Sequence, residues 1–293
     1  MKCPFSGSYV ALPTPFRGDA VDLESFRALI DFHVERRSDG LVAVGTSGEA
    51  ATLSDYERRS VIEAAVEHSA GRLPVIAGVG TNSTRVTLEL ARFAEKAGAD
   101  GALAVTPYYN KPTPKGLLGH YGALAEACAL PIVLYNVPSR TGCDLKPATV
   151  AELRRRHANV VAIKEASNSV GRARELLAIS DIALIAGEDG LIAELMSLGA
   201  AGVIGVVANI APSEVAELCR VARPGGDAAR TAELVAWLSP LVRDLFIESN
   251  PIPMKAALAA MGLCSEEVRL PLATLEDASR ERLLATLHEA GLV

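Results

Sequence analysis

The stretch VIAGVGTNSTRVTLELARFAEKAGADGALAV, residues 75–105, contains the repeating unit from which the fold follows. It opens with a short apolar run over residues 75–78 and closes with another over residues 101–105, and a longer helical segment separates the two. The AGADG segment at residues 97–101 supplies glycine where a helix ends and a strand begins. Strand, helix and strand in this order predict one parallel β-α-β unit.

The same alternation extends over most of the chain. Helix start signals lie between the apolar runs: a capping-box pattern at residues 54–57 and prolines at positions 114 and 147. The runs are mostly continuous, as in parallel strands that are buried on both faces. Eight β-then-α units over about 220 residues predict an α/β fold, a (β/α)8 TIM barrel. The predicted strands are residues 9–12, 40–44, 75–78, 101–105, 132–135, 160–164, 182–186 and 202–206.

A doubly wound open sheet is the alternative architecture. It is disfavoured because no Gly-x-Gly-x-x-Gly pattern follows the first strand, and the GVGTNS segment at residues 78–83 lacks the third glycine. We interpret that segment as a turn at a strand end.

The pattern changes near the C-terminus. The RPGGD segment at residues 223–227 is typical of a linker, and no strand signal follows it. We therefore expect a catalytic barrel over residues 1–224 and a C-terminal helical appendage over residues 225–293. The helices expected in the appendage are residues 228–246, 253–261 and 275–290.

Composition limits the class of protein. The 293 residues are 49% hydrophobic and 22% charged, with a net charge of −6, so the chain is globular and lacks the basic excess of nucleic-acid binders. No apolar run reaches the roughly 18 residues of a membrane span, and no signal peptide is recognisable. Five scattered cysteines indicate free thiols in a reducing compartment. The five histidines share no ligand spacing. We expect a cytoplasmic protein without metal or cofactor, and without nucleic-acid or membrane partners.

Polar groups follow several predicted strands at the end where barrels place their active sites. The glycine-flanked pair Thr46 and Ser47 forms a turn whose N–H groups suit a carboxylate. Arg140 is suited to clamp a second carboxylate. Lys164 ends a buried strand, where partial desolvation favours the neutral amine that attacks a carbonyl to form a Schiff base. Tyr135 and the pair at residues 108–109 add hydroxyls for proton transfer.

Each of these features also has an ordinary structural explanation. A tight turn, packed aromatic rings, a surface arginine and a snorkelling lysine would all look the same in isolation. Their convergence on one barrel mouth, without a metal cluster or a nucleophile elbow, favours Schiff-base chemistry on a keto acid.

Three segments carry a resemblance to a known family: GTSGE at residues 45–49, YNVP at 135–138 and IKE at 163–165. The chain resembles the pyruvate-dependent class I aldolases, the superfamily of N-acetylneuraminate lyase and dihydrodipicolinate synthase, and most closely the dihydrodipicolinate synthase family. The similarity extends to ESNPIPMK at residues 248–255. It implies condensation of pyruvate with L-aspartate 4-semialdehyde, which gives 4-hydroxy-tetrahydrodipicolinate in the first committed step of lysine and diaminopimelate biosynthesis.

The resemblance also implies residue roles. Lys164 would form the imine with pyruvate, Tyr135 would relay protons, and Thr46 would link Tyr135 to Tyr109, which a neighbouring subunit lends. Such sharing implies an oligomer, a homotetramer arranged as a dimer of dimers. The implied substrate-binding residues are Thr46 and Ser47 for pyruvate, Arg140 for aspartate semialdehyde, and Gly187 and Ile204 as pocket lining.

The chain departs from the family pattern in two places. Ser47 stands where many synthases carry threonine, and its hydroxyl is kept. The polar residues that hold lysine in lysine-inhibited relatives are mostly replaced, so we expect weak or absent inhibition by lysine. The replaced positions are Ala50, Asp55, Arg58 and Val86, and only Asn82 and Tyr108 are retained.

Two other functions remain open at this point. One is a different pyruvate-dependent Schiff-base aldolase or lyase, which acts on sialic acid, a 2-keto-3-deoxy sugar acid or hydroxy-oxoglutarate. Such an enzyme need not carry Arg140 or the tyrosine pair. The other is a non-catalytic relative that only binds a keto acid, and it is disfavoured because every matched catalytic position is filled.

Overall fold

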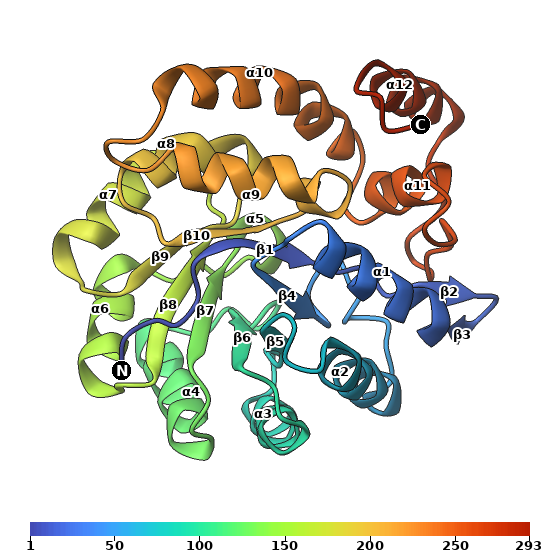
Figure 1. The fold of residues 1–293 in the computed structure, drawn as a ribbon. Coiled ribbons are helices and arrows are strands. Elements are labelled where there is room, and N and C mark those ends of the chain that lie inside the picture. The colour runs from blue at the N-terminus through green and yellow to red at the C-terminus, as the bar shows by residue number, and fades with distance from the viewer.

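The computed structural model describes all 293 residues, and its centre is a closed barrel of eight parallel strands (Figure 1). Each strand pairs with the next along the chain, and the last pairs with the first. The predicted (β/α)8 barrel is confirmed, and all eight predicted strands lie within two residues of their observed ends. The barrel strands are β1 Gly7–Ala11, β4 Gly40–Ala43, β5 Val75–Gly78, β6 Gly101–Val105, β7 Ile132–Asn136, β8 Val160–Glu165, β9 Ala183–Ala186 and β10 Gly202–Gly205.

Helices surround the barrel. The predicted capping box forms at the start of α2, where Ser54 and Glu57 satisfy each other's backbone N–H groups. The predicted prolines at positions 114 and 147 begin α4 and α6. The surrounding helices are α1 Leu23–Glu35, α2 Asp55–Ser69, α3 Thr84–Ala97, α4 Pro114–Ala127, α5 Pro138–Thr141, α6 Pro147–Arg156, α7 Val170–Ile179, η1 Asp189–Leu191, α8 Ile192–Ser197, η2 Val207–Asn209 and α9 Pro212–Val221.

Alternation along the strands divides the core into two parts. A cluster of 14 buried residues fills the barrel interior, and a cluster of 68 fills the layer between strands and helices and continues under the C-terminal helices. In β7, Val133 and Tyr135 belong to the inner cluster, whereas Ile132 and Leu134 belong to the outer one. Because strand side chains alternate, the residue after an inward-facing one points to the helices.

The observed strands near the N-terminus differ from the predicted ones. The first strand begins at Gly7 rather than at residue 9, because Gly7 pairs with Gly202 and both lack side chains that would collide there. A short hairpin, β2 Phe16–Arg17 with β3 Ala20–Val21, was not predicted. Two-residue strands show no period that a sequence pattern could reveal.

The three expected C-terminal helices are confirmed, with ends shifted by one or two residues: α10 Ala228–Leu245, α11 Ile252–Ala260 and α12 Asp277–Glu289. Helix α10 lies across α9 and packs against α12, while α11 contacts α12 and η2 (Figure 1). The RPGGD segment connects α9 to α10.

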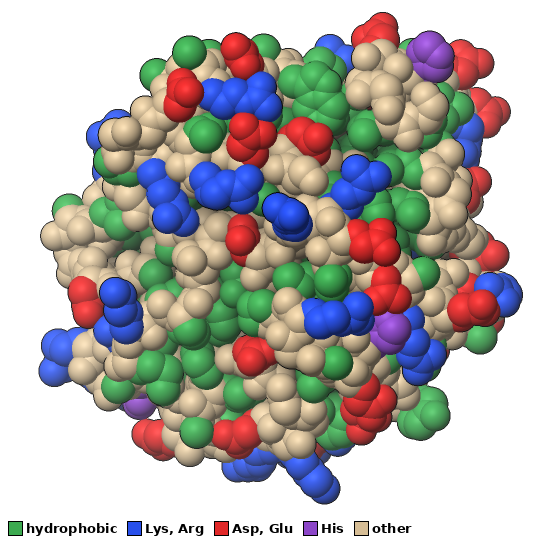
Figure 2. Space-filling view, viewed as in Figure 1, with side chains coloured by type: hydrophobic (Ala, Val, Ile, Leu, Met, Phe, Trp, Pro, Cys, Tyr) green, Lys and Arg blue, Asp and Glu red, His purple; other side chains and the backbone are tan.

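The surface carries both signs of charge. Acidic and basic side chains are interspersed over the face seen in Figure 2. None of the helices combines the length and the apolar character needed to cross a membrane.

Candidate active site

A cavity of about 310 Å³ lies at the C-terminal ends of β4, β5, β6 and β7. Thr46, Tyr135 and Arg140, all predicted site residues, line it together with Tyr108. The C-terminal segment completes the wall through Asn250, Pro251, Pro271 and Leu272. No group of three His, Cys, Asp or Glu side chains is arranged to hold a metal ion.

Lys164 is buried without a direct ion-pair or hydrogen-bond partner. Its residue is 6% exposed, and its amine makes no ion pair or hydrogen bond within 4 Å. Its Nζ lies 4.4 Å from the centroid of the Tyr135 ring, and the two residues are register partners on β8 and β7. Buried lysines are normally paired, so an unpaired amine beside a cavity is a strong candidate for a nucleophile.

Two carboxyl groups follow β9 near this lysine. Burial raises the pKa of Glu188 and of Asp189 above the usual values, and the nearby Lys164 amine opposes that rise. Asp189 accepts hydrogen bonds from the N–H groups of Val206 and Val207, so it also fixes the backbone after β10.

The turn after β4 presents free donors. The N–H groups of Thr46 and Ser47 have no acceptor within the chain. The turn is bracketed by Val44 and Glu49, which both adopt positive φ angles of 57° and 52°. Positive φ is rare for non-glycine residues and a true outlier for a β-branched one. A strained turn with unpaired N–H groups is suited to bind an anion.

Asn250 joins two predicted binding residues and was missed by the sequence analysis as a site residue. Its side-chain amide donates to the Ser47 hydroxyl at 3.0 Å, and its backbone carbonyl accepts from the Arg140 guanidinium at 3.2 Å. Its side-chain oxygen is buried without a partner. The only signal for it was its place in the ESNPIPMK segment.

Five predicted site residues are not part of the cavity wall: Ser47, Tyr109, Lys164, Gly187 and Ile204. Tyr109 is 88% exposed, has a φ of 74°, and makes no hydrogen bond to Thr46 or Tyr135 in the single chain. Ile204 is buried in the inner core with Tyr135, and Gly187 lies just after β9. Thr46, Tyr135 and Arg140 thus line the cavity in the single chain. Ser47 follows Thr46 in the turn and Lys164 lies against the Tyr135 ring, whereas Tyr109 stays outside.

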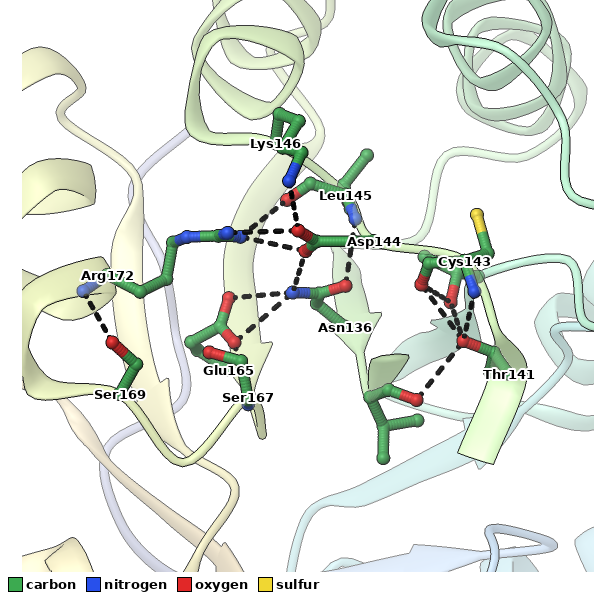
Figure 3. Close-up of polar contacts among 12 residues, drawn as sticks. Asn136, Thr141, Cys143, Asp144, Leu145, Lys146, Glu165, Ser167, Ser169 and Arg172 are labelled. Atoms are coloured by element: carbon green, nitrogen blue, oxygen red, sulfur yellow. Dashed lines mark hydrogen bonds and ion pairs between the residues drawn. The ribbon is translucent and has the colours of Figure 1, made fainter. Parts of the chain in front are cut away.

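A buried polar network lies behind Tyr135 and Lys164 (Figure 3). Asn136 and Glu165 are the next residues on β7 and β8, and they point toward the helices. The Asn136 amide donates to both Glu165 oxygens at 3.1–3.2 Å and to Asp144 at 3.2 Å. Arg172 of α7 binds Asp144 in a two-point ion pair, which holds the pKa of Asp144 well below its usual value. The network therefore joins the two strand ends to α7.

A parallel barrel with an unpaired lysine at the C-terminal mouth defines a class, the enzymes equipped for Schiff-base formation. The model of the Dihydrodipicolinate synthetase family matches residues 4–290, so the chain belongs to this family.

Individual relatives agree with this assignment. A 4-hydroxy-tetrahydrodipicolinate synthase of Pelobacter propionicus is 50% identical over 291 residues, which cover 99% of this chain and 100% of the relative. The crystal structure of dihydrodipicolinate synthase from Aquifex aeolicus matches with a TM-score of 0.96 at 42% identity, over 98% of this chain and 99% of that one. A monomeric dihydrodipicolinate synthase variant matches with a TM-score of 0.96 at 41% identity, over 99% and 98% of the two chains.

The family resemblance drawn from the sequence motifs is confirmed. The chain is an enzyme of this family, and its relatives support the synthase interpretation over the sialic-acid lyase and sugar-acid aldolase alternatives.

Proposed function

We propose that Lys164 forms an imine with pyruvate and that the enzyme condenses this pyruvate with L-aspartate 4-semialdehyde. The observation that carries the proposal is the buried, unpaired Lys164 amine 4.4 Å from the Tyr135 ring. The unpaired N–H groups of the turn after β4 and the guanidinium of Arg140 supply anion-binding groups at the same mouth.

The proposed reaction proceeds through an imine, an enamine, addition to the aldehyde and ring closure. The neutral Lys164 amine attacks the pyruvate ketone carbon, and Tyr135 passes protons to the departing hydroxyl, so that water leaves and an imine forms. Loss of a methyl proton gives the enamine, whose carbon attacks the aldehyde carbon of the second substrate. The substrate's amino group then attacks the imine carbon, displaces Lys164 and closes the ring. A positioned proton relay contributes about 10²–10⁴-fold to such steps.

The binding residues divide between the two substrates. Thr46 and Ser47 hold the pyruvate carboxylate through their N–H groups, and Arg140 receives the carboxylate of aspartate semialdehyde. We assign Gly187, just after β9, and Ile204 of β10 to the lining of the bound substrate, as the family resemblance implies. Thr46 passes protons between Tyr135 and the Tyr109 of a neighbouring subunit.

The test is pyruvate-dependent consumption of L-aspartate 4-semialdehyde, coupled to a reductase for the cyclic product. We expect activity in the purified protein and a loss of about 10³-fold or more in Lys164→Ala, the scale seen when a covalent nucleophile is removed. Lys115→Ala, at an exposed lysine of α4, is the matched control and should retain activity. Folded protein without activity would contradict the synthase proposal and leave the acceptor aldehyde to be found.

We further propose a homotetramer, a dimer of dimers in which Tyr109 completes the neighbouring site. The exposed ring of Tyr109 on a strained backbone supports this. Mixing Lys164→Ala with Tyr109→Phe tests it, because the Lys164-containing site of a mixed dimer receives an intact tyrosine. Activity above the sum of the separate variants is expected. No recovery in mixed dimers shown to form would contradict sharing, and sedimentation of wild type reports the assembly.

Weak or absent inhibition by lysine also remains a proposal. Ala50 and Arg58 line the cavity near Tyr108, where the family's inhibitor site carries polar groups. Low-millimolar lysine should leave the initial rate nearly unchanged, and substantial inhibition at that concentration or below would contradict the proposal. We propose the cytoplasm as the site of action, which the five free cysteines support.

We also propose the division into a catalytic barrel over residues 1–224 and a helical domain over residues 225–293. The position of the boundary in the connection between α9 and α10 supports it.

A further inference from the structure

Lys255 is a buried cation that the proposed chemistry does not use. It lies on α11 with 0% exposure, and its Nζ is 2.6 Å from a Glu49 oxygen whose side chain is 1% exposed. The same Nζ donates to the Glu267 carbonyl at 2.5 Å and lies 4.1 Å from the Phe16 ring centroid. Because its Nζ already donates to Glu49 and to the Glu267 carbonyl and faces the Phe16 ring, Lys255 is not a second nucleophile.

Its partner Glu49 ends the turn that carries Thr46 and Ser47. Glu49 has a φ of 52°, and its N–H donates to the Thr46 carbonyl at 3.1 Å. Its second carboxylate oxygen accepts the N–H of Arg269 at 3.0 Å. The strained end of the turn is therefore clamped on both carboxylate oxygens by residues of the C-terminal segment.

Further contacts reinforce the clamp. Asn250 donates to the Ser47 hydroxyl, and Thr14 donates to the Gly48 carbonyl at 2.7 Å. The Arg269 guanidinium lies 4.4 Å from the same Phe16 ring that Lys255 covers. A positive φ at a non-glycine residue persists only where its surroundings fix it, and here those surroundings come from Thr14 and from residues 250–269.

We propose that Lys255 is a positioning residue, which acts through Glu49 to hold the turn after β4 so that the Thr46 and Ser47 N–H groups meet the pyruvate carboxylate. This rests on the proposed function. Burial lowers the pKa of Lys255 and the Glu49 carboxylate opposes that effect. A charged pair held in this way makes the C-terminal helices part of the substrate site.

The experiment separates positioning from folding by using neutral replacements. Lys255→Met alone leaves Glu49 buried without a counter-charge, which is strongly destabilising, whereas removing both charges together is often nearly neutral. The double variant Lys255→Met with Glu49→Gln should therefore regain most of the thermal stability. It should still need about 10-fold more pyruvate for half-maximal trapping of the imine by borohydride, because small misplacements of binding groups carry costs of this order.

Borohydride trapping needs only pyruvate, so its outcomes distinguish the two proposals. Wild type without a trapped adduct on Lys164 would contradict the proposed function. Wild type that is trapped, together with a folded double variant that is half-saturated at the same pyruvate concentration, would overturn the role of Lys255 alone.

The matched control is Asp244→Asn, at a carboxylate of α10 with 0% side-chain exposure that binds Thr286, Arg243 and Arg282. It should lower thermal stability and leave the half-saturating pyruvate concentration unchanged. An equal rise in Asp244→Asn would show that general destabilisation, and not the clamp on the turn, sets pyruvate affinity, and would also overturn the proposal.

Discussion

Two sets of contacts, here called supports, hold the proposed site in place. They differ in the sequence separation of the residues that form them. Behind the proposed nucleophile, Asn136 and Glu165 are the immediate neighbours of Tyr135 and Lys164 on adjacent strands. Behind the turn proposed to bind the pyruvate carboxylate, Glu49 is held by Lys255, 206 positions away. The barrel fixes the first support through strand register, whereas the second exists only when the C-terminal helices are in place.

This difference has a functional meaning. Disturbing the first support should change how fast the imine forms, because it moves the amine and the proton relay. Disturbing the second should change how well pyruvate is bound, because it moves the N–H donors that we propose for the pyruvate carboxylate. The two supports are therefore separable as an effect on kcat and an effect on the KM for pyruvate.

Among the variants that test this comparison, the largest effect is expected when Asn136, the central residue of the first support, is replaced. Asn136→Ala removes a buried amide that donates to Glu165 and Asp144 and accepts from the Leu145 N–H. We expect kcat to fall about 10²-fold with little change in the pyruvate KM, the scale of a small misplacement of reacting groups. Steady-state kinetics and the rate of imine trapping measure it.

A matched variant lies at the opposite end of the neighbouring strand β8. Asn159, just before β8, donates its side-chain amide to the carbonyls of Ala125 and Cys128. Asn159→Ala should cost similar stability and leave kcat near wild type. If both variants lose kcat equally, the network behind Lys164 has no special role.

The next largest effect is expected at Arg140, the residue that connects the two supports. Arg140 follows β7 and donates to the Asn250 carbonyl beside the turn. Arg140→Ala should raise the KM for L-aspartate 4-semialdehyde about 10–100-fold, as expected for loss of 1.5–3 kcal/mol in a charged hydrogen bond. The pyruvate KM should change far less. A rise confined to pyruvate would reassign Arg140 to the first substrate.

A smaller effect is expected from Glu165→Gln. In the native enzyme the Ser167 N–H donates to Glu165 at 2.8 Å, and the oxygen of the new glutamine could still accept this bond. The NH₂ group of the glutamine, however, would face the NH₂ group of Asn136, and two donors cannot bond to each other. We expect kcat to fall about 10-fold, the size of one compromised buried hydrogen bond. Adding Asn136→Asp reverses donor and acceptor within the pair. It should recover only part of kcat, because the new carboxylate also faces Asp144. A double variant worse than both singles would contradict direct coupling of the pair.

The two supports also differ in what a sequence can reveal. Apolar runs separated by helical segments predicted the strands, and register then brought Lys164 to Tyr135. The polar network behind them follows from the same alternation. The contact of Lys255 with Glu49, and of Asn250 with Ser47, depends on helix packing across more than 200 positions, for which one sequence holds no periodic signal. Phe16, which lies under both cations, sits in the hairpin that the pattern missed.

The smallest effect lies outside both supports and concerns stability alone. His33 on α1 is buried, its Nδ1 meets the Ser38 hydroxyl at 3.0 Å, and its Nε2 has no partner. Burial lowers its pKa to about 3, so between pH 6.5 and about 3 the unfolded chain binds the extra proton and stability falls as pH falls. From pH 7 to pH 5 this amounts to about 2 kcal/mol. His33→Gln should therefore lose less unfolding free energy than wild type over that range, measured by urea unfolding at both pH values. The kinetic constants at pH 8 should not change, because His33 belongs to neither support. If the free energy of unfolding depends on pH identically in the variant and the wild type, His33 does not titrate in this way.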